Sequence, residues 1–197
     1  MRAGERRAPR APKMSRAALE RAAVHHLQRY PASQEQLRRV LMRRLRRAEM
    51  RSAPGEGPDR EQAIAHITEL VESLAEKGSL DDARLASALA SDWLRGGVSP
   101  AMMRSKLRCK GISSEIASEA VKEALVRARD QGADPEVAAA TAYARRRRLG
   151  PFRLDQEQRY ERRQKDLASL GRRGFRFDVA RTVIDAKDPS DLPDPLL

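Results

Sequence analysis

The stretch that decides the fold runs from Gly78 to Val121 and reads G-S-L-D-D-A-R-L-A-S-A-L-A-S-D-W-L-R-G-G-V-S-P-A-M-M-R-S-K-L-R-C-K-G-I-S-S-E-I-A-S-E-A-V. Apolar residues recur in it at helical spacing, and glycine, serine and proline interrupt them at the points where helices end and begin. The stretch therefore predicts three short helices in succession.

The first of these helices follows Gly78. Leu80 enters it, and Asp81 and Asp82 stand in its first turn, where carboxylates favour the positive end of the helix dipole. The pair Gly96-Gly97 ends the helix, because glycine readily adopts the left-handed conformation of a helix C-terminus.

The second helix opens with Ser99 as N-cap and Pro100 at the first helical position. Gly111 ends it. Either Ser113 or Ser114 then caps the third helix.

Part of this pattern recurs. Residues 107–121 and 170–184 both read L-x-x-x-G-[IF]-x-x-[ED]-[IV]-A-x-x-[AV]-[VI], offset by 63 positions without a gap. The glycine ends one helix, and the next apolar residue packs against the helix that has just ended. The acid lies in the first turn of the following helix. The matching residues are Leu107, Gly111 and Ile112 in the first copy and Leu170, Gly174 and Phe175 in the second.

The whole chain is predicted to be all-α, an elongated right-handed tandem array of three three-helix units that bury their apolar stripes against one another. The sequence places these units at 16–77, 78–131 and 132–186. A capping-box pair, Ser33 and Gln36, opens the second helix of the first unit. We expect residues 1–15 to be a disordered basic tail and residues 187–197 to be a disordered, acidic, proline-rich tail.

Composition limits the possible functions. Of 197 residues, 40% are apolar, only 4% are aromatic and 35% are charged, which suits thin helical layers better than a thick aromatic core. Lys and Arg number 40 against 28 Asp and Glu, a net charge of +12, which indicates a phosphate-rich or acidic partner. No apolar run reaches the length of a membrane span and no secretory signal stands at the N-terminus, so we expect a cytoplasmic protein without membrane contact.

Signs of catalysis are missing from the sequence. It has no glycine-rich phosphate loop, no Ser/His/Asp set and no metal-ligand spacing, and its single cysteine excludes a cysteine-based zinc site. We therefore expect no enzyme, no catalytic residues, no metal and no cofactor.

Arginine runs are the candidate contact sites. One lies on a helix opposite its leucine stripe, with no acid between Arg38 and Arg47. Solvated helix faces usually mix signs of charge, so the run favours a nucleic-acid or acidic-protein contact over a purely solvated face. The candidate contact residues are Arg38, Arg39, Arg43, Arg46, Arg47, Arg145, Arg146, Arg147, Arg148, Arg172 and Arg173.

The order of motifs resembles the RecX family, bacterial regulators of the RecA recombinase. The resemblance covers roughly residues 16–186 and is strongest in G-S-L-D-D-A-R-L-A (78–86), K-G-I (110–112), R-R-G-F (172–175) and S-x-x-x-L-R-R (33–39). The residues that carry its structural motifs are Leu80, Asp81, Asp82, Arg84, Pro100, Leu107, Gly111, Ile112, Gly174 and Phe175.

The resemblance implies a curved, monomeric array that lies in the groove of the RecA filament on single-stranded DNA. There it would limit extension, ATPase, strand exchange and co-protease activity; duplex DNA is a further expected partner. The sequence departs from the family at Ser91 and Trp93, which replace positions that are often basic, so the flanking units would supply more of the charge. Two alternatives remain: a sequence-independent DNA-binding module that masks DNA, and a helical scaffold for an acidic protein.

Overall fold

The computed structural model describes residues 14–53, 57–130 and 132–194, and for Gln156 the backbone alone. These residues form nine α-helices and two short 3₁₀ helices and contain no β-strand, which confirms the all-α fold class. They divide into two compact units, Met1–Asp81 and Asp82–Leu197. Each unit is described by itself, and the elongated, right-handed arrangement of the array stays a prediction.

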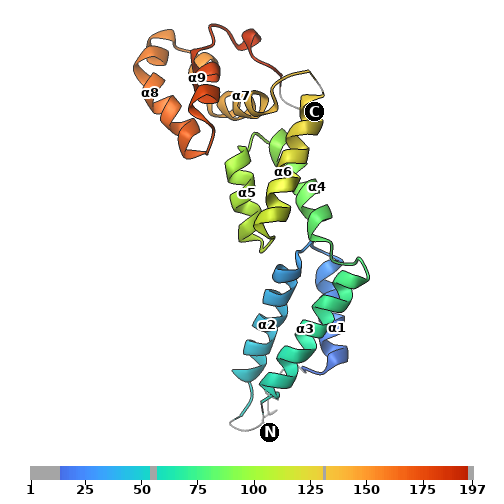
Figure 1. Cartoon of the computed structure of the whole chain (residues 1–197). Helices are drawn as coiled ribbons and strands as arrows, with labels where there is room; N and C mark the ends of the chain where they lie inside the picture. Colours follow the sequence, from blue (N-terminus) through green and yellow to red (C-terminus); the bar gives the residue numbers. More distant parts are fainter. Residues whose placement is uncertain (1–13, 54–56, 131, 195–197) are drawn as a thin grey trace, which may run out of the picture. The chain divides into compact units, whose positions relative to one another are not determined.

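Three helices make up the first unit: α1 (Arg16–Leu27), α2 (Gln34–Glu49) and α3 (Arg60–Glu76). All three pack against one another (Figure 1). Their core is built from leucine, isoleucine and valine at helical spacing, and its fully buried members are Leu19, Leu37, Leu41, Leu45, Ile67 and Val71. Met14, which the sequence assigned to the basic tail, is also buried in this core.

Side-chain caps fix where these helices begin. The Ser33 hydroxyl accepts a hydrogen bond from the Gln36 backbone N–H at 3.1 Å, and the Gln36 side chain accepts one from the Ser33 N–H at 3.2 Å. The predicted capping box is thereby confirmed. Asp59 caps α3 by accepting a hydrogen bond from the Gln62 N–H at 3.0 Å.

The segment after α3 differs from its prediction. Leu80 does not enter the next helix but is buried in the core of the first unit, and its N–H donates to the carbonyl of Leu74. Gly78, at φ +69°, turns the chain back so that this apolar residue covers the end of α3. The following helix begins at Asp82, with Asp81 directly before it.

Six helices form the second unit around one continuous core (Figure 1). They are α4 (Asp82–Arg95), α5 (Pro100–Cys109), α6 (Ser114–Arg129), α7 (Pro135–Arg147), α8 (Gln156–Arg172) and α9 (Phe177–Asp185), with η1 (Gly150–Phe152) before α8 and η2 (Pro189–Asp191) after α9. This unit therefore holds the segments predicted as the second and third three-helix units. The most extensive helix pairing within it joins α4 and α6.

The sequence repeat reappears as a repeated helix ending. Gly111 ends α5 at φ +82°, and the N–H of Ile112 reaches back to the carbonyl of Leu107 at 3.2 Å. Gly174 ends α8 in the same way at φ +80°, and the N–H of Phe175 donates to the carbonyl of Leu170 at 3.2 Å. In both copies the leucine and the residue after the glycine are buried, as the Schellman arrangement requires.

The two repeat copies are held together at the loop between α4 and α5. Gly97 is buried there at φ +70°, and a Cβ on it would lie 2.8 Å from the carbonyl oxygen of Ala139 in α7. The buried hydroxyl of Ser99 caps α5 through the N–H of Met102 at 3.2 Å and donates to the carbonyl of Arg173 beyond α8. This loop therefore joins two neighbouring helices and the end of α8.

The C-terminal segment differs from its prediction over the described residues 187–194. Residues 189–191 form η2, and Leu192 is buried in the core of the second unit. Arg159 of α8 donates hydrogen bonds to the carbonyls of Ala186 and Lys187, the latter at 3.0 Å. One buried leucine and these hydrogen bonds hold the segment against the unit, a consequence of tertiary packing that composition does not reveal. Residues 195–197, like residues 1–13 of the other predicted tail, lie outside the described residues.

Candidate nucleic-acid interface

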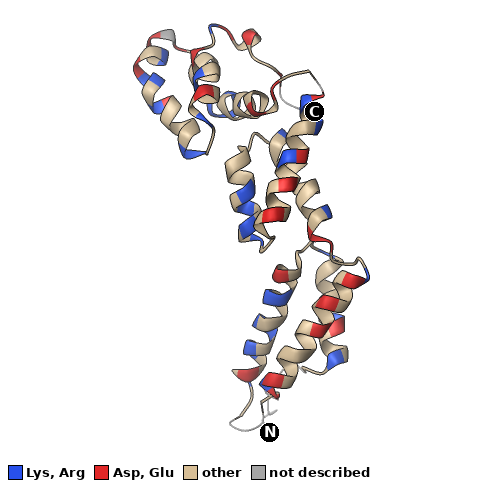
Figure 2. Cartoon of the chain, viewed as in Figure 1, with Lys and Arg blue, Asp and Glu red and all other residues tan. Residues whose placement is uncertain are grey.

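The arginines of α2 fall into two sets, and Figure 2 shows the basic residues along this helix. Arg38 and Arg39 both approach Glu35, one turn earlier, at 4.0 Å and 2.8 Å between Nε and a carboxylate oxygen. Arg38 also donates to the hydroxyl of Thr68 in α3 at 3.4 Å. The acid that precedes the arginine run thus neutralises its first two members in part.

Further along α2, Arg43, Arg46 and Arg47 are exposed and have no acidic partner among the described residues. Arg46 and Arg47 stand in the last turn of the helix, where cations oppose the negative end of the helix dipole. Their position therefore stabilises the helix while leaving the guanidinium groups available to an outside anion.

The run at the end of α7 is partly used inside the protein. Arg145 forms a 3.4 Å ion pair with Asp194 of the C-terminal segment, and its guanidinium lies 5.5 Å from the centre of the Phe152 ring. Arg146 donates to the carbonyl of Gly96 at 2.9 Å. Arg148 adopts a left-handed conformation at φ 52° and ends the helix.

Arg173, near the end of α8, joins the α7 run at Tyr143. Its guanidinium lies 5.5 Å from the centre of the Tyr143 ring. Burial alone would raise the pKa of the Tyr143 hydroxyl, but hydrogen bonds with Ser169 and Arg173 and the nearby charges of Arg173 and Arg147 more than offset it and lower this pKa. Arg172 is exposed. The structure therefore brings Arg147 and Arg173 into one cationic neighbourhood.

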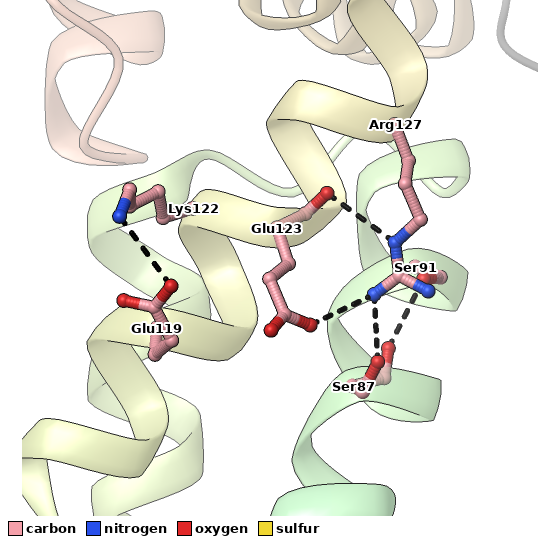
Figure 3. A network of polar contacts seen from close by, with 6 residues as sticks. All are labelled: Ser87, Ser91, Glu119, Lys122, Glu123 and Arg127. Atoms are coloured by element: carbon pink, nitrogen blue, oxygen red, sulfur yellow. Dashed lines mark hydrogen bonds and ion pairs between the residues drawn. The ribbon is translucent and has the colours of Figure 1, made fainter.

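Charged side chains on the α4–α6 side of the second unit form ion pairs with one another (Figure 3). Arg127 of α6 donates to the hydroxyl of Ser87 in α4 at 2.7 Å and lies 3.3 Å from the carboxylate of Glu123. Lys122 and Glu119 form a further pair at 3.4 Å. Exposed pairs of this kind contribute little stability, but they leave this side of the unit without a surplus of positive charge.

Trp93 packs against the core of the second unit and also makes a cation–π contact. The Lys106 ammonium of α5 lies 4.4 Å from the centre of the indole ring. Arg84, at the start of α4, is exposed. Trp93 therefore lies in contact with a basic residue of the neighbouring helix.

One feature of the first unit was missed in the sequence. A groove of about 730 Å³ runs between α1 and α2, and we call it the α1–α2 groove. It is lined by Ala18, Arg21, Ala22, His25, His26, Val40, Leu41, Arg43, Arg44, Arg47 and Arg51. The spacing of positions 40, 44 and 47 could have revealed a second stripe on α2, but only the packing of α1 shows that Arg21 and the histidines face it.

Two general observations complete the site. Within residues 14–53, 57–130 and 132–194, no three His, Cys, Asp or Glu side chains come together as metal ligands. No helix in the same ranges has the length and apolar character needed to cross a bilayer.

Comparison with known proteins decides the family. The chain is 39% identical over 181 residues to the regulatory protein RecX of Myxococcus xanthus (strain DK1622), and the match covers 91% of both chains. The chain belongs to the RecX family. The resemblance drawn from its motifs is thereby confirmed.

Two further matches agree with this assignment. The sequence model of the second three-helix domain of RecX matches residues 81–121, which contain most of the stretch that decides the fold. The regulatory protein RecX of Agrobacterium fabrum (strain C58 / ATCC 33970) is 26% identical over 163 residues, 83% of this chain and 79% of its own. No solved structure matches the chain.

Proposed function

We propose that this RecX family member regulates the RecA recombinase, mainly as an inhibitor. It binds in the groove of the RecA filament on single-stranded DNA and limits filament extension, ATPase, strand exchange and co-protease activity. It acts as a monomer in the cytoplasm. The observation that carries the proposal is the 39% identity to a regulatory protein RecX across nearly the whole of both chains.

The contact residues of this proposal are those candidate arginines that have neither an acidic side chain nor a backbone carbonyl as a partner among the described residues. In the first unit these are Arg43, Arg46 and Arg47; in the second they are Arg147, Arg148, Arg172 and Arg173. Arg38, Arg39, Arg145 and Arg146 belong to the same surfaces but already interact within the protein. Guanidinium groups suit both DNA phosphates and carboxylates of RecA, because their planar fork binds either anion in a bidentate manner.

A titration of RecA's DNA-dependent ATPase tests the proposal. We expect inhibition at or below a one-to-one ratio of this protein to RecA, and we expect it to persist when free competing DNA is added in excess. A protein that merely masks DNA is drawn away by the competitor, so inhibition that vanishes as DNA is added would favour the DNA-masking alternative. No inhibition at any ratio would leave the helical scaffold for an acidic protein as the better account.

A further inference from the structure

The α1–α2 groove concentrates positive charge from two helices. Five arginines and two histidines line it, and no acidic side chain of the described residues does. Its floor is formed by small and apolar residues such as Ala18, Ala22 and Leu41. At about 730 Å³ it lies within the usual size range of ligand-binding clefts.

Among the described residues, the cations of the groove have no acidic counter-charge. No ion pair joins Arg21, Arg43, Arg44, Arg47 or Arg51 to an acid among the described residues, whereas Arg39 on the same helix pairs with Glu35 at 2.8 Å. The Nε atom of Arg44 is buried and has no hydrogen-bond acceptor in the described part of the chain. A buried donor without an acceptor costs free energy, and an anion in the groove would remove that cost.

The arginines form a row along the groove. Arg43 and Arg44, then Arg47, stand on successive turns in the second half of α2 and span about 6 Å at about 1.5 Å of rise per residue, and Arg51 follows just beyond the end of the helix. Arg21 and the histidine pair face this row from α1. A single carboxylate would satisfy one member of such a row, whereas a chain of phosphates presents several negative charges to it.

We propose that the α1–α2 groove is a binding site for a run of adjacent phosphates. The run is supplied by a nucleic-acid strand or by a free oligophosphate, which share the same tetrahedral, multiply charged chemistry. This site goes beyond the proposed regulation of RecA, because the groove lies within the first unit and binds without RecA. Arg44 supplies the innermost donor, and the exposed arginines at positions 21 and 47 close on the chain from opposite sides.

Calorimetric titration of the full chain with sodium tripolyphosphate tests the site. The double variant R21Q/R47Q removes one exposed arginine from each wall, and R16Q/R29Q removes the same charge from exposed positions near the two ends of α1, outside the groove. We expect the groove variant to lose about tenfold or more in affinity and the control to lose about twofold or less. Equal losses in the two variants, or no binding to the unaltered chain at low salt, would overturn the proposal.

A second experiment separates the two sources of phosphate. Tripolyphosphate is added to a complex of the chain with a fluorescently labelled oligothymidylate, and anisotropy reports whether the strand is released. Release of the strand, together with weaker DNA binding by R21Q/R47Q than by R16Q/R29Q, supports the site and assigns it to a nucleic-acid strand. If the strand stays bound at saturating tripolyphosphate while the calorimetric affinity still depends on the groove arginines, the result supports the site. It then assigns the site to a free oligophosphate. Arg44→Lys keeps the charge but removes the Nε donor, and unchanged tripolyphosphate affinity in this variant would contradict the role given to Arg44.

Discussion

Gly97 determines how closely α7 can approach the loop after α4. Its backbone has φ +70°, where side chains other than hydrogen are strained, and it is buried against α7. A Cβ at this position would lie 2.8 Å from the Ala139 carbonyl oxygen and 3.0 Å from the Tyr143 nitrogen. Both neighbours are backbone atoms of one helix, so neither can move away without shifting α7.

Replacing Gly97 with alanine should therefore destabilise the second unit by about 3 kcal/mol, from left-handed strain and overpacking together. Gly132→Ala is a matched control, because Gly132 also has a positive φ, +97°, but a Cβ there meets nothing within 4 Å. It should cost about 1 to 2 kcal/mol. Urea unfolding followed by the fluorescence of Trp93, the sole tryptophan, measures both. Equal losses would show that α7 is not packed against this glycine.

At the scale of elements, one buried carboxylate organises the connection from α7 to α8. Asp166 is only 2% exposed and accepts hydrogen bonds from Nε and Nη2 of Arg153, at 2.8 Å and 2.6 Å, and from the N–H of Gly150 at 2.9 Å. The hydrogen bond with Asp166 raises the pKa of Arg153, so this guanidinium stays charged in the folded state. The carboxylate thereby joins α8 to η1 and to the residue that follows it.

Asp166→Asn should lower the unfolding free energy of the second unit by about 3 kcal/mol, because it leaves a partly buried guanidinium without its counter-charge. The ion pair of Arg163 with Asp185, at 2.6 Å, is the comparison, since each of its side chains is more than a third exposed. Asp185→Asn should cost about 1 kcal/mol or less, because water screens the pair. Trp93 fluorescence in urea serves here too, and a loss for Asp166→Asn no larger than for Asp185→Asn would be the contrary result.

Helix ends could be predicted from the sequence, and tertiary contacts could not. The Ser33 capping box and the glycine endings at 111 and 174 depend on residues a few positions apart, so local patterns revealed them. Leu80 belongs to the first core because the chain turns back after α3, which its sequence neighbours do not show. The α1–α2 groove depends on the packing of two helices, and the pattern on α2 alone shows only one of its walls.

Across the whole molecule, positive charge is distributed unevenly. The side of the second unit where α4 meets α6 pairs its charges internally, whereas α2 and the region around Tyr143 keep arginines without acidic partners among the described residues (Figures 2 and 3). A protein that uses such surfaces on a RecA-coated strand gains contacts with both RecA and DNA. A protein that only binds DNA gains contacts with DNA phosphates alone, and RecA already covers many of these phosphates.

The affinity of the chain for RecA-coated single-stranded DNA, compared with its affinity for the same strand uncoated, tests the central claim most directly. Fluorescence anisotropy with one labelled oligonucleotide, at one salt concentration and with a slowly hydrolysed ATP analogue, measures both. We predict affinity for the coated strand that is about tenfold higher or more, a difference of about 1.4 kcal/mol in binding free energy. Equal or tighter binding to the uncoated strand would contradict a RecA regulator that recognises the filament.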